Sequence, residues 1–335
     1  MTSNKKKRII VMVGVLLLLL CYIIGIRYII GNVSAYDNEG GENTKHYVAV
    51  IAKSTESNFW QTVFAGANAA STEYNLSITV DGPDNEEDYE TQNRMIEQAV
   101  EDDAEVIIFS AVDYNANADA INAAVKQGVK VVVIDSDVNS DKVSSRISTD
   151  NYQAGRMAGE AVLNCRDEQL NIGIVNFDKN AANGQQREEG FREMVSADPR
   201  VNIVDAVNVI STIEDSKEAT LQMVAEHPEI NAIVTFNEWT SLGVGEAIQE
   251  LHYAERISVV AFDNNVASVG LLETGEVDAL IVQNPFAMGY LGVETAYNLI
   301  YELPLGETKV DTATTLVTKE NMFGDEFQRV LFSFD

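Results

Sequence analysis

The chain has few of the residues that mark fibrous, disordered or disulfide-stapled proteins. Five prolines and 21 glycines among 335 residues are too few for a collagen-like or low-complexity chain. Only two cysteines occur, Cys21 in a long apolar run and Cys165 in the polar body, so no disulfide framework exists. With 46% hydrophobic residues, the composition suits a globular protein of about two domains.

Basic residues are scarce beyond the N-terminus. Five of the 23 basic residues and none of the 52 acidic ones lie within residues 1–30, which leaves 18 basic against 52 acidic side chains in the remainder. So acidic a body repels phosphate backbones, which argues against a nucleic-acid partner. We attribute the charge to solubility.

The sequence lacks the usual patterns for cofactors and metals. It contains no Walker loop, no complete dinucleotide fingerprint and no nucleophile elbow. The three histidines, His46, His227 and His252, have no Cys or Glu at metal-ligand spacing. Asp137–Asp141 begins like a calcium loop, but Lys142 takes the obligatory glycine position. We therefore expect no metal site and no cofactor.

An apolar run near the N-terminus predicts a membrane segment. Lys5–Arg8 precede the uncharged run Ile9–Ile26, which at about 1.5 Å per residue reaches roughly 27 Å and nearly spans a bilayer core. The basic cluster places the N-terminus in the cytoplasm and the body outside it. We predict a cytoplasmic basic segment over 1–8, a single-pass anchor in the cell membrane over 9–30 and a polar linker over 31–45.

Two other interpretations of this segment stay open. It is a cleaved signal peptide if Val33–Ala35 serves as the cleavage site. It is a lipoprotein signal if Cys21 is lipidated, although Leu20 stands where a small residue is normal.

From Tyr47 onward, short β-rich apolar runs alternate with stretches of helix length. Runs that are apolar on both faces are typical of buried parallel strands, and strand–helix alternation predicts doubly wound sheets. The predicted strands are Tyr47–Ala52, Leu76–Val80, Glu105–Phe109, Val129–Ile134, Leu170–Val175, Val201–Val207, Asn231–Phe236, Ile257–Phe262 and Val277–Val282. We expect an α/β protein with two such domains.

Polar and aromatic side chains recur just after these strands. Ligands of open α/β sheets bind at the carboxyl ends of the strands. Carboxylates and amides match the paired hydroxyls of a sugar, and aromatic planes match the apolar faces of its ring. The segments are Phe59-Trp60, Asp135-Ser136, Asn237-Glu238-Trp239, Asp263-Asn264 and Gln283-Asn284. They predict a site for a small polar ligand, a monosaccharide or related polyol.

At these residues the chain resembles the type I periplasmic binding proteins, in their ribose-binding branch, over Tyr47 to Glu320. The resemblance rests on motifs in matching order: Glu56–Trp60, Val133–Asp135, Ser148–Asn151, Gln185–Phe191, Val234–Glu238, Val259–Asp263 and Ile281–Gln283. It implies that Phe59 and Trp60 stack on the ligand. It implies that its hydroxyls are held by Asp135, Asn237, Asp263 and Gln283.

Several positions depart from the ribose pattern. Ser57 stands where the family often has Asn, Ser136 follows Asp135, and Gln185 stands where Arg is frequent. Ser211 replaces a common aromatic residue, and Trp239 is our hypothesis for the missing aromatic wall. An unchanged affinity in Trp239→Ala would refute that role. The departures argue against ribose itself as the ligand.

The resemblance also implies two Rossmann-like lobes joined by a three-crossover hinge. It places one lobe over 46–150 and 284–312, the other over 151–283, and a final crossover and C-terminal segment over 313–335. The implied function is non-enzymatic sugar capture for a bacterial importer of the ATP-binding-cassette (ABC) type. A sensory role with a membrane histidine kinase is the alternative. A sugar hydrolase or isomerase would need a carboxylate pair such as Asp135 and Asp263.

Overall fold

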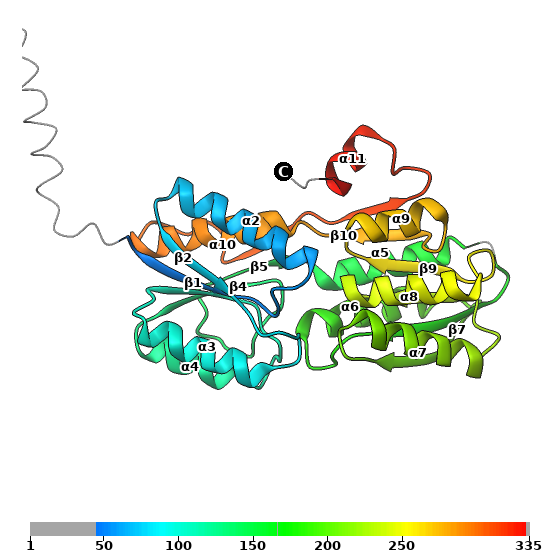
Figure 1. Ribbon diagram of the computed structural model, residues 1–335, viewed down its shortest axis with the longest axis horizontal. Helices are drawn as coiled ribbons and strands as arrows, with labels where there is room; N and C mark the ends of the chain where they lie inside the picture. Colours follow the sequence, from blue (N-terminus) through cyan, green and yellow to red (C-terminus); the bar gives the residue numbers. More distant parts are fainter. Residues whose placement is uncertain (1–44, 166, 333–335) are drawn as a thin grey trace, which may run out of the picture. The chain divides into compact units, whose positions relative to one another are not determined.

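Two six-stranded sheets, each covered by helices on both faces, organise the residues that the computed structural model describes, 45–165 and 167–332 (Figure 1). The first sheet has the order β11-β5-β4-β3-β1-β2 and the second β12-β10-β9-β8-β6-β7. The first contains β1 (Tyr47–Ile51), β2 (Ser77–Asp81), β3 (Val106–Phe109), β4 (Lys130–Ile134), β5 (Ser145–Thr149) and β11 (Lys309–Thr312). The second contains β6 (Leu170–Asn176), β7 (Val201–Asn208), β8 (Ala232–Thr235), β9 (Ser258–Phe262), β10 (Ala279–Val282) and β12 (Thr315–Thr318).

Each sheet and its helices form one lobe. In the first lobe, α2 (Asn58–Glu73) and α10 (Pro285–Ile300) pack on one face and α3 (Tyr89–Glu101) and α4 (Ala118–Lys126) on the other (Figure 1). In the second lobe, α5 (Asn151–Leu163) and α6 (Ala182–Val195) share one core. The opposite core contains α7 (Ile213–Glu226), α8 (Glu238–Leu251), α9 (Val266–Thr274) and the C-terminal α11 (Asp325–Leu331).

The buried strands explain this layered arrangement. Strands β3, β8 and β10 are buried at every residue, because helices cover both faces of the sheet. All strand pairs are parallel except β10 with β12, which is antiparallel. The α/β architecture of two parallel sheets predicted from the sequence is thus confirmed.

The chain passes between the two sheets three times. It leaves the first sheet after β5 to enter α5, returns after β10 to enter α10, and leaves again between β11 and β12. The two sheets have the same strand order when β4 is matched to β9 and β1 to β6. A loop that follows a strand in one lobe therefore has an equivalent loop after the matched strand of the other lobe.

Three strands were absent from the sequence prediction. β5 alternates buried with half-buried residues, and β11 and β12 are four residues long and largely polar. β5 pairs with the preceding β4 and with the distant β11, and β12 pairs with the distant β10. No local pattern encodes the distant pairings.

The predicted membrane anchor over 9–30 lies outside the described residues, as do the cytoplasmic segment and nearly all of the linker. Within residues 45–165 and 167–332, no helix is long and apolar enough to cross a bilayer. The described residues from His46 onward form one compact unit.

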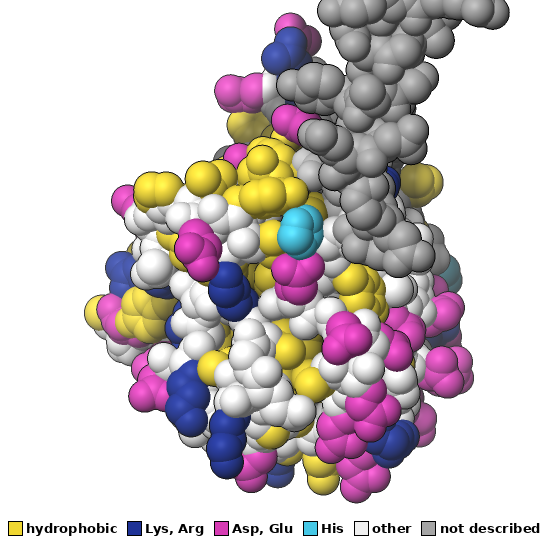
Figure 2. All heavy atoms as spheres, turned by 90° about the vertical axis from the view of Figure 1, so that its left-hand side faces the viewer, with side chains coloured by type: hydrophobic (Ala, Val, Ile, Leu, Met, Phe, Trp, Pro, Cys, Tyr) yellow, Lys and Arg dark blue, Asp and Glu magenta, His cyan; other side chains and the backbone are white. Residues whose placement is uncertain are grey.

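The surface is polar and mixed in charge. On the described part of the face in Figure 2, acidic and basic side chains are interspersed with uncharged groups, and hydrophobic side chains gather toward one edge. Exposed hydrophobic residues of the first lobe include Tyr301 and Leu303, which follow α10. In this view, acidic side chains gather toward the lower right and basic side chains toward the lower left.

Candidate functional site

A small cavity lies between the lobes, where the carboxyl ends of both sheets face each other. Its walls come from both lobes. From the first lobe it is lined by Lys53, Ser57, Phe59, Trp60, Glu86 and Asp135. From the second lobe it is lined by Phe177, Asn183, Arg187, Asn237, Glu238, Trp239, Asp263 and Gln283. We refer to this space as the interlobe cavity.

Two aspartates occupy equivalent places in the two lobes. Asp135 follows β4 and Asp263 follows β9, and both are buried. Both adopt the left-handed backbone conformation, with φ of 54° and 67°, which non-glycine residues rarely take. Their backbone N–H groups donate to the neighbouring strands, at Ile147 O and Ile281 O. Such strained positions persist where the surroundings fix them, often at binding sites.

Arg187, on α6, lines the cavity and connects the start of α5 with the segments that follow β8 and β10. Its side chain is 1% exposed and donates to Asn151 Oδ1 (2.9 Å), Phe236 O (2.6 Å) and Gln283 Oε1 (2.7 Å). It lies 3.8 Å from Asp135 Oδ1. Arg187 therefore fixes the orientation of Gln283, and not all of its N–H groups are used by hydrogen bonds within the described residues.

Gln283 completes this network. Its Nε2 donates to Asp263 Oδ1 at 2.6 Å, and its Oε1 also accepts from Thr149 Oγ1 at 2.7 Å. Asn183 donates to both oxygens of Asp135 at 3.1 Å. Asp263 keeps its second carboxylate oxygen without a hydrogen bond in the described residues, which leaves an acceptor for a ligand hydroxyl.

Lys53 brings a buried ammonium group to the cavity. Its Nζ lies 3.6 Å from Glu86 Oε2 and 4.9 Å from the centroid of the Phe177 ring. No acceptor in the described residues lies within hydrogen-bond distance of this nitrogen. Glu86 instead accepts from Trp60 Nε1 at 2.9 Å and Ser211 Oγ at 3.1 Å. Lys53 is thus the donor most available to a ligand.

Burial dominates the titration of the site. It raises the pKa of Asp263 to about 7, against the lowering effect of Arg187 and of the Gln283 hydrogen bond. Burial also raises the pKa of Asp135, with Arg187 and Lys53 opposing it, and lowers the pKa of Arg187. Desolvation disfavours the charged form of each group. The attraction between the buried acidic and basic side chains offsets part of this cost.

Most of the predicted site residues meet at the cavity. Ser57, whose Oγ accepts from the Trp60 N–H as the cap of α2, lies in its wall. So do Phe59, Trp60, Asp135, Asn237, Trp239, Asp263 and Gln283. Phe59 and Trp60 form an edge-to-face pair with ring centroids 5.1 Å apart.

Two predicted residues are placed elsewhere. Gln185 is exposed, donates to Lys179 O at 2.5 Å, and lines a surface hollow on α6. Because residues two apart on a helix face opposite sides, Arg187 points inward where Gln185 points outward. Ser136 is fully buried and does not line the cavity; its Oγ has no hydrogen-bond partner in the described residues.

Several lining residues were not in the predicted set. Lys53 and Phe177 follow β1 and β6, so the strand-end rule itself could have found them, and Glu238 lies in a strand-end segment but was not chosen as a ligand-binding residue. Arg187 lies in the motif Gln185–Phe191 but needed the correct helical phase. Glu86 carries no sequence signal, because it reaches the cavity from a loop between β2 and α3.

The interlobe cavity is nearly filled by its own side chains. Its free volume is only about 20 Å³, which is room for about one or two water molecules. A larger hollow, about 270 Å³ by the same measure, lies beside the hinge against α11 and shares Phe59, Asp263 and Gln283 with the cavity. A monosaccharide enters the interlobe cavity only if the lobes separate or these side chains move.

No group of His, Cys, Asp and Glu in the described residues could hold a metal ion. What the cavity offers is a set of fixed donors, acceptors and aromatic rings on two lobes that the chain connects three times. That arrangement suits recognition of a small polar molecule by enclosure.

Comparisons with known proteins agree with this geometry. The family model described as a periplasmic binding protein domain matches residues 48–302. The chain is 27% identical over 288 residues to the D-ribose/D-allose-binding protein of Pseudomonas aeruginosa, covering 82% of this chain and 89% of that protein.

Solved structures give the same result. A carbohydrate-transporter solute-binding protein of Agrobacterium radiobacter in complex with D-arabinose is 27% identical, with a TM-score of 0.84 over 87% of this chain and all of that one. An ABC-transporter solute-binding protein of Agrobacterium vitis with bound D-fucose is 29% identical, with a TM-score of 0.82 over 85% of this chain and all of that one. The chain belongs to the periplasmic binding protein family, in the ribose-binding branch of type I, whose members bind solutes and are not enzymes.

Proposed function

We propose that this chain is a membrane-tethered, extracytoplasmic binding protein that captures a monosaccharide or related polyol between its two lobes and presents it to an ABC importer. The observation that carries the proposal is the wall of the interlobe cavity. Acceptors (Asp135, Asp263), donors (Lys53, Arg187) and aromatic rings there come from both lobes.

This wall matches the chemistry of a sugar. Each sugar hydroxyl both donates and accepts, so it can pair with a carboxylate on one side and an ammonium or guanidinium on the other. The rings of Phe59, Trp60 and Trp239 offer surfaces for the C–H faces of the ring. The ligands named for the similar proteins, D-ribose or D-allose, D-arabinose and D-fucose, are all monosaccharides.

The proposed binding cycle uses the hinge. The lobes, proposed to span 46–150 with 284–312 and 151–283, separate to admit the ligand and close around it. The three chain passages between the sheets support this proposal, since a few residues there can absorb the rotation. Asp135 and Asp263, Asn237 and Gln283 would hold the hydroxyls.

The tether is proposed from residues 1–30. A basic cluster followed by a long apolar run orients the body to the outside of the membrane. Cell fractionation tests this: an uncleaved chain should stay with the membrane after a high-salt wash. A chain of reduced mass in the soluble fraction would establish cleavage instead.

The partner is tested separately. Copurification of the full chain with a permease and its ATPase supports the importer. Copurification with a histidine kinase would replace that partner by a sensory one and leave sugar binding untouched.

Sugar capture is tested by thermal unfolding of the unit from His46 onward against pentoses, hexoses, inositols and other polyols. A ligand at about 100 times its Kd stabilises the native state by roughly 2.7 kcal/mol, which raises the Tm by a few degrees. A clear shift with one sugar is expected. No shift with any member, from a protein that unfolds cooperatively, would contradict sugar capture.

A further inference from the structure

One buried carboxylate of the interlobe cavity is engaged by the protein itself. Glu238, the first residue of α8 in the second lobe, is 5% exposed. Its oxygens accept from the backbone N–H groups of Asn58 (3.3 Å) and Phe59 (2.9 Å), which open α2 in the first lobe. They also accept from Asn58 Nδ2 (3.2 Å) and Asn265 Nδ2 (2.8 Å).

These four donors use the acceptor capacity of the carboxylate. A carboxylate offers about four lone-pair sites, and Glu238 receives four N–H groups. A ligand therefore gains little from it, unlike Asp263, whose second oxygen is unused. Glu238 lines the cavity but serves the contact between lobes.

The position of Glu238 is electrostatically favourable. It faces the N-terminus of α2, lies at the N-terminus of its own helix α8, and accepts from Asn265, the N-cap of α9. Helix N-termini carry partial positive charge and unpaired N–H groups, so each favours a carboxylate. Without the lobe contact, the first two N–H groups of α2 would turn to water.

A second carboxylate crosses in the opposite direction. Glu86 of the first lobe accepts from Ser211 Oγ (3.1 Å) and from Asn237 Nδ2 (3.5 Å) of the second. Asn237 and Glu238 are adjacent, so both crossings converge on the start of α8. Each lobe therefore contributes one carboxylate that accepts hydrogen bonds from the other lobe.

We propose that Glu238 is a closure residue that caps helix α2 of the facing lobe and stabilises the closed conformation before any ligand binds. Because Phe59 is one of the capped residues, the same contact sets the ring of Phe59 beside Trp60 as the lobes meet. The inference rests on the proposed function for the captured ligand, but closure itself can be measured without one.

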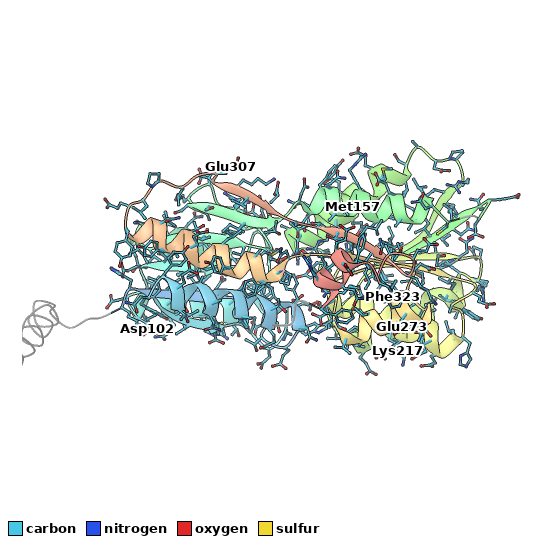
Figure 3. All side chains as sticks on the ribbon, turned by 90° about the horizontal axis from the view of Figure 1, so that it is seen from above. Asp102, Met157, Lys217, Glu273, Glu307 and Phe323 are labelled. Atoms are coloured by element: carbon cyan, nitrogen blue, oxygen red, sulfur yellow. The ribbon has the colours of Figure 1, made fainter. Side chains whose placement is uncertain are left out.

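The first test is small-angle X-ray scattering of the ligand-free unit from His46 onward. The wild type should match the radius of gyration calculated for the closed structure, and Glu238→Gln should be larger, because an amide cannot accept all four N–H groups. Glu250→Gln is the matched control, because Glu250 lies on the same helix, is exposed and pairs with Lys217. Lys217 lies at the outer edge of the second lobe (Figure 3).

A second variant changes the other side of the contact. Asn58→Asp suits the first turn of α2, so the first lobe should fold normally. Opposite Glu238, however, it sets two carboxylates about one hydrogen-bond length apart, and we expect the ligand-free protein to open. In the double variant Asn58→Asp, Glu238→Gln, a carboxylate again faces an amide, and closure should return.

Affinity gives the third readout. For a sugar that raises the Tm of the wild type, Glu238→Gln and Asn58→Asp should each weaken binding at least about ten-fold, mainly through faster release, and the double variant should recover part of it. Equal radii for wild type, both single variants and the control would overturn the role of Glu238. A panel in which no sugar binds contradicts the proposed function alone, because the scattering comparison still decides closure.

Discussion

At the residue scale, the site depends on buried charges held by specific hydrogen bonds. Arg187 makes three hydrogen bonds through its planar guanidinium and lies over the Phe262 ring at 4.9 Å. A lysine keeps the charge but cannot reproduce this fork. Arg187 lies on the inward face of α6, whereas Gln185 lies on its exposed face.

We expect Arg187→Lys to weaken sugar binding about ten-fold or more and to lower stability by about 2 kcal/mol, since it leaves buried acceptors unpaired. Gln185→Ala should leave the Kd within about two-fold, because Gln185 is exposed and away from the cavity. Calorimetric titration of both variants checks this. A loss of affinity in Gln185→Ala of the same size as in Arg187→Lys would contradict the placement.

The raised pKa of Asp263 predicts a pH dependence. The folded protein holds this proton up to about pH 7, whereas the carboxyl of the unfolded chain titrates near 3.8. Between these values the native state binds more protons, so its stability falls as pH rises through the window and is level below it.

Asp263→Asn should remove this component. The Tm of ligand-free wild type minus that of the variant should decline from pH 4 to pH 7 and then level off. Thermal unfolding at several pH values measures the difference. Parallel curves for the two proteins would show that the pKa of Asp263 is not raised in the native state.

At the element scale, paired glycines bring the helices together in each lobe. A Cβ on Gly155 of α5 would lie 1.9 Å from Arg187 O, and one on Gly190 of α6 would lie 2.0 Å from Tyr152 O. In the first lobe, a Cβ on Gly289 would lie 1.9 Å from Val63 O. Close backbone packing of α5 on α6 therefore fixes where Arg187 stands.

Gly155→Ala should push α6 away, cost about 1–3 kcal/mol of stability and weaken sugar binding through the displaced Arg187. Gly270→Ala on α9 is the control, since nothing lies within 4 Å of its added Cβ. It should leave stability unchanged or raise it by up to about 1 kcal/mol. Unfolding and titration of both variants measure the effect; equal behaviour would contradict the packing argument.

The alternation of apolar runs and helical stretches was enough to predict the α/β class and the central strands from the sequence. Periodicity did not reveal β5, β11 or β12, whose segments are short and half-polar. β11 pairs with the distant β5 and β12 with the distant β10, whereas β5 also pairs with the preceding β4. The rule that ligands bind at the carboxyl ends of the strands selected Asp135, Asp263 and Gln283, which line the interlobe cavity. It did not reach Glu86, because loop geometry brings that residue in.

At the scale of the whole molecule, the two lobes have equivalent strand orders, and each contributes part of the wall of the interlobe cavity. Each sheet supplies an aspartate after the matched strands β4 and β9, and hydrogen bonds connect residues of the two lobes. Neither lobe alone presents all the donors and acceptors of the cavity. Binding strength should therefore depend on closure as well as on ligand contacts.

A crystal structure of the complex decides whether a sugar is held between the lobes. With the sugar that raises the Tm, we expect electron density for one ring between Phe59, Trp60 and Trp239, with hydroxyls bonded to Asp135 and Asp263. Density in the larger hollow beside α11, with the interlobe cavity empty, would contradict it.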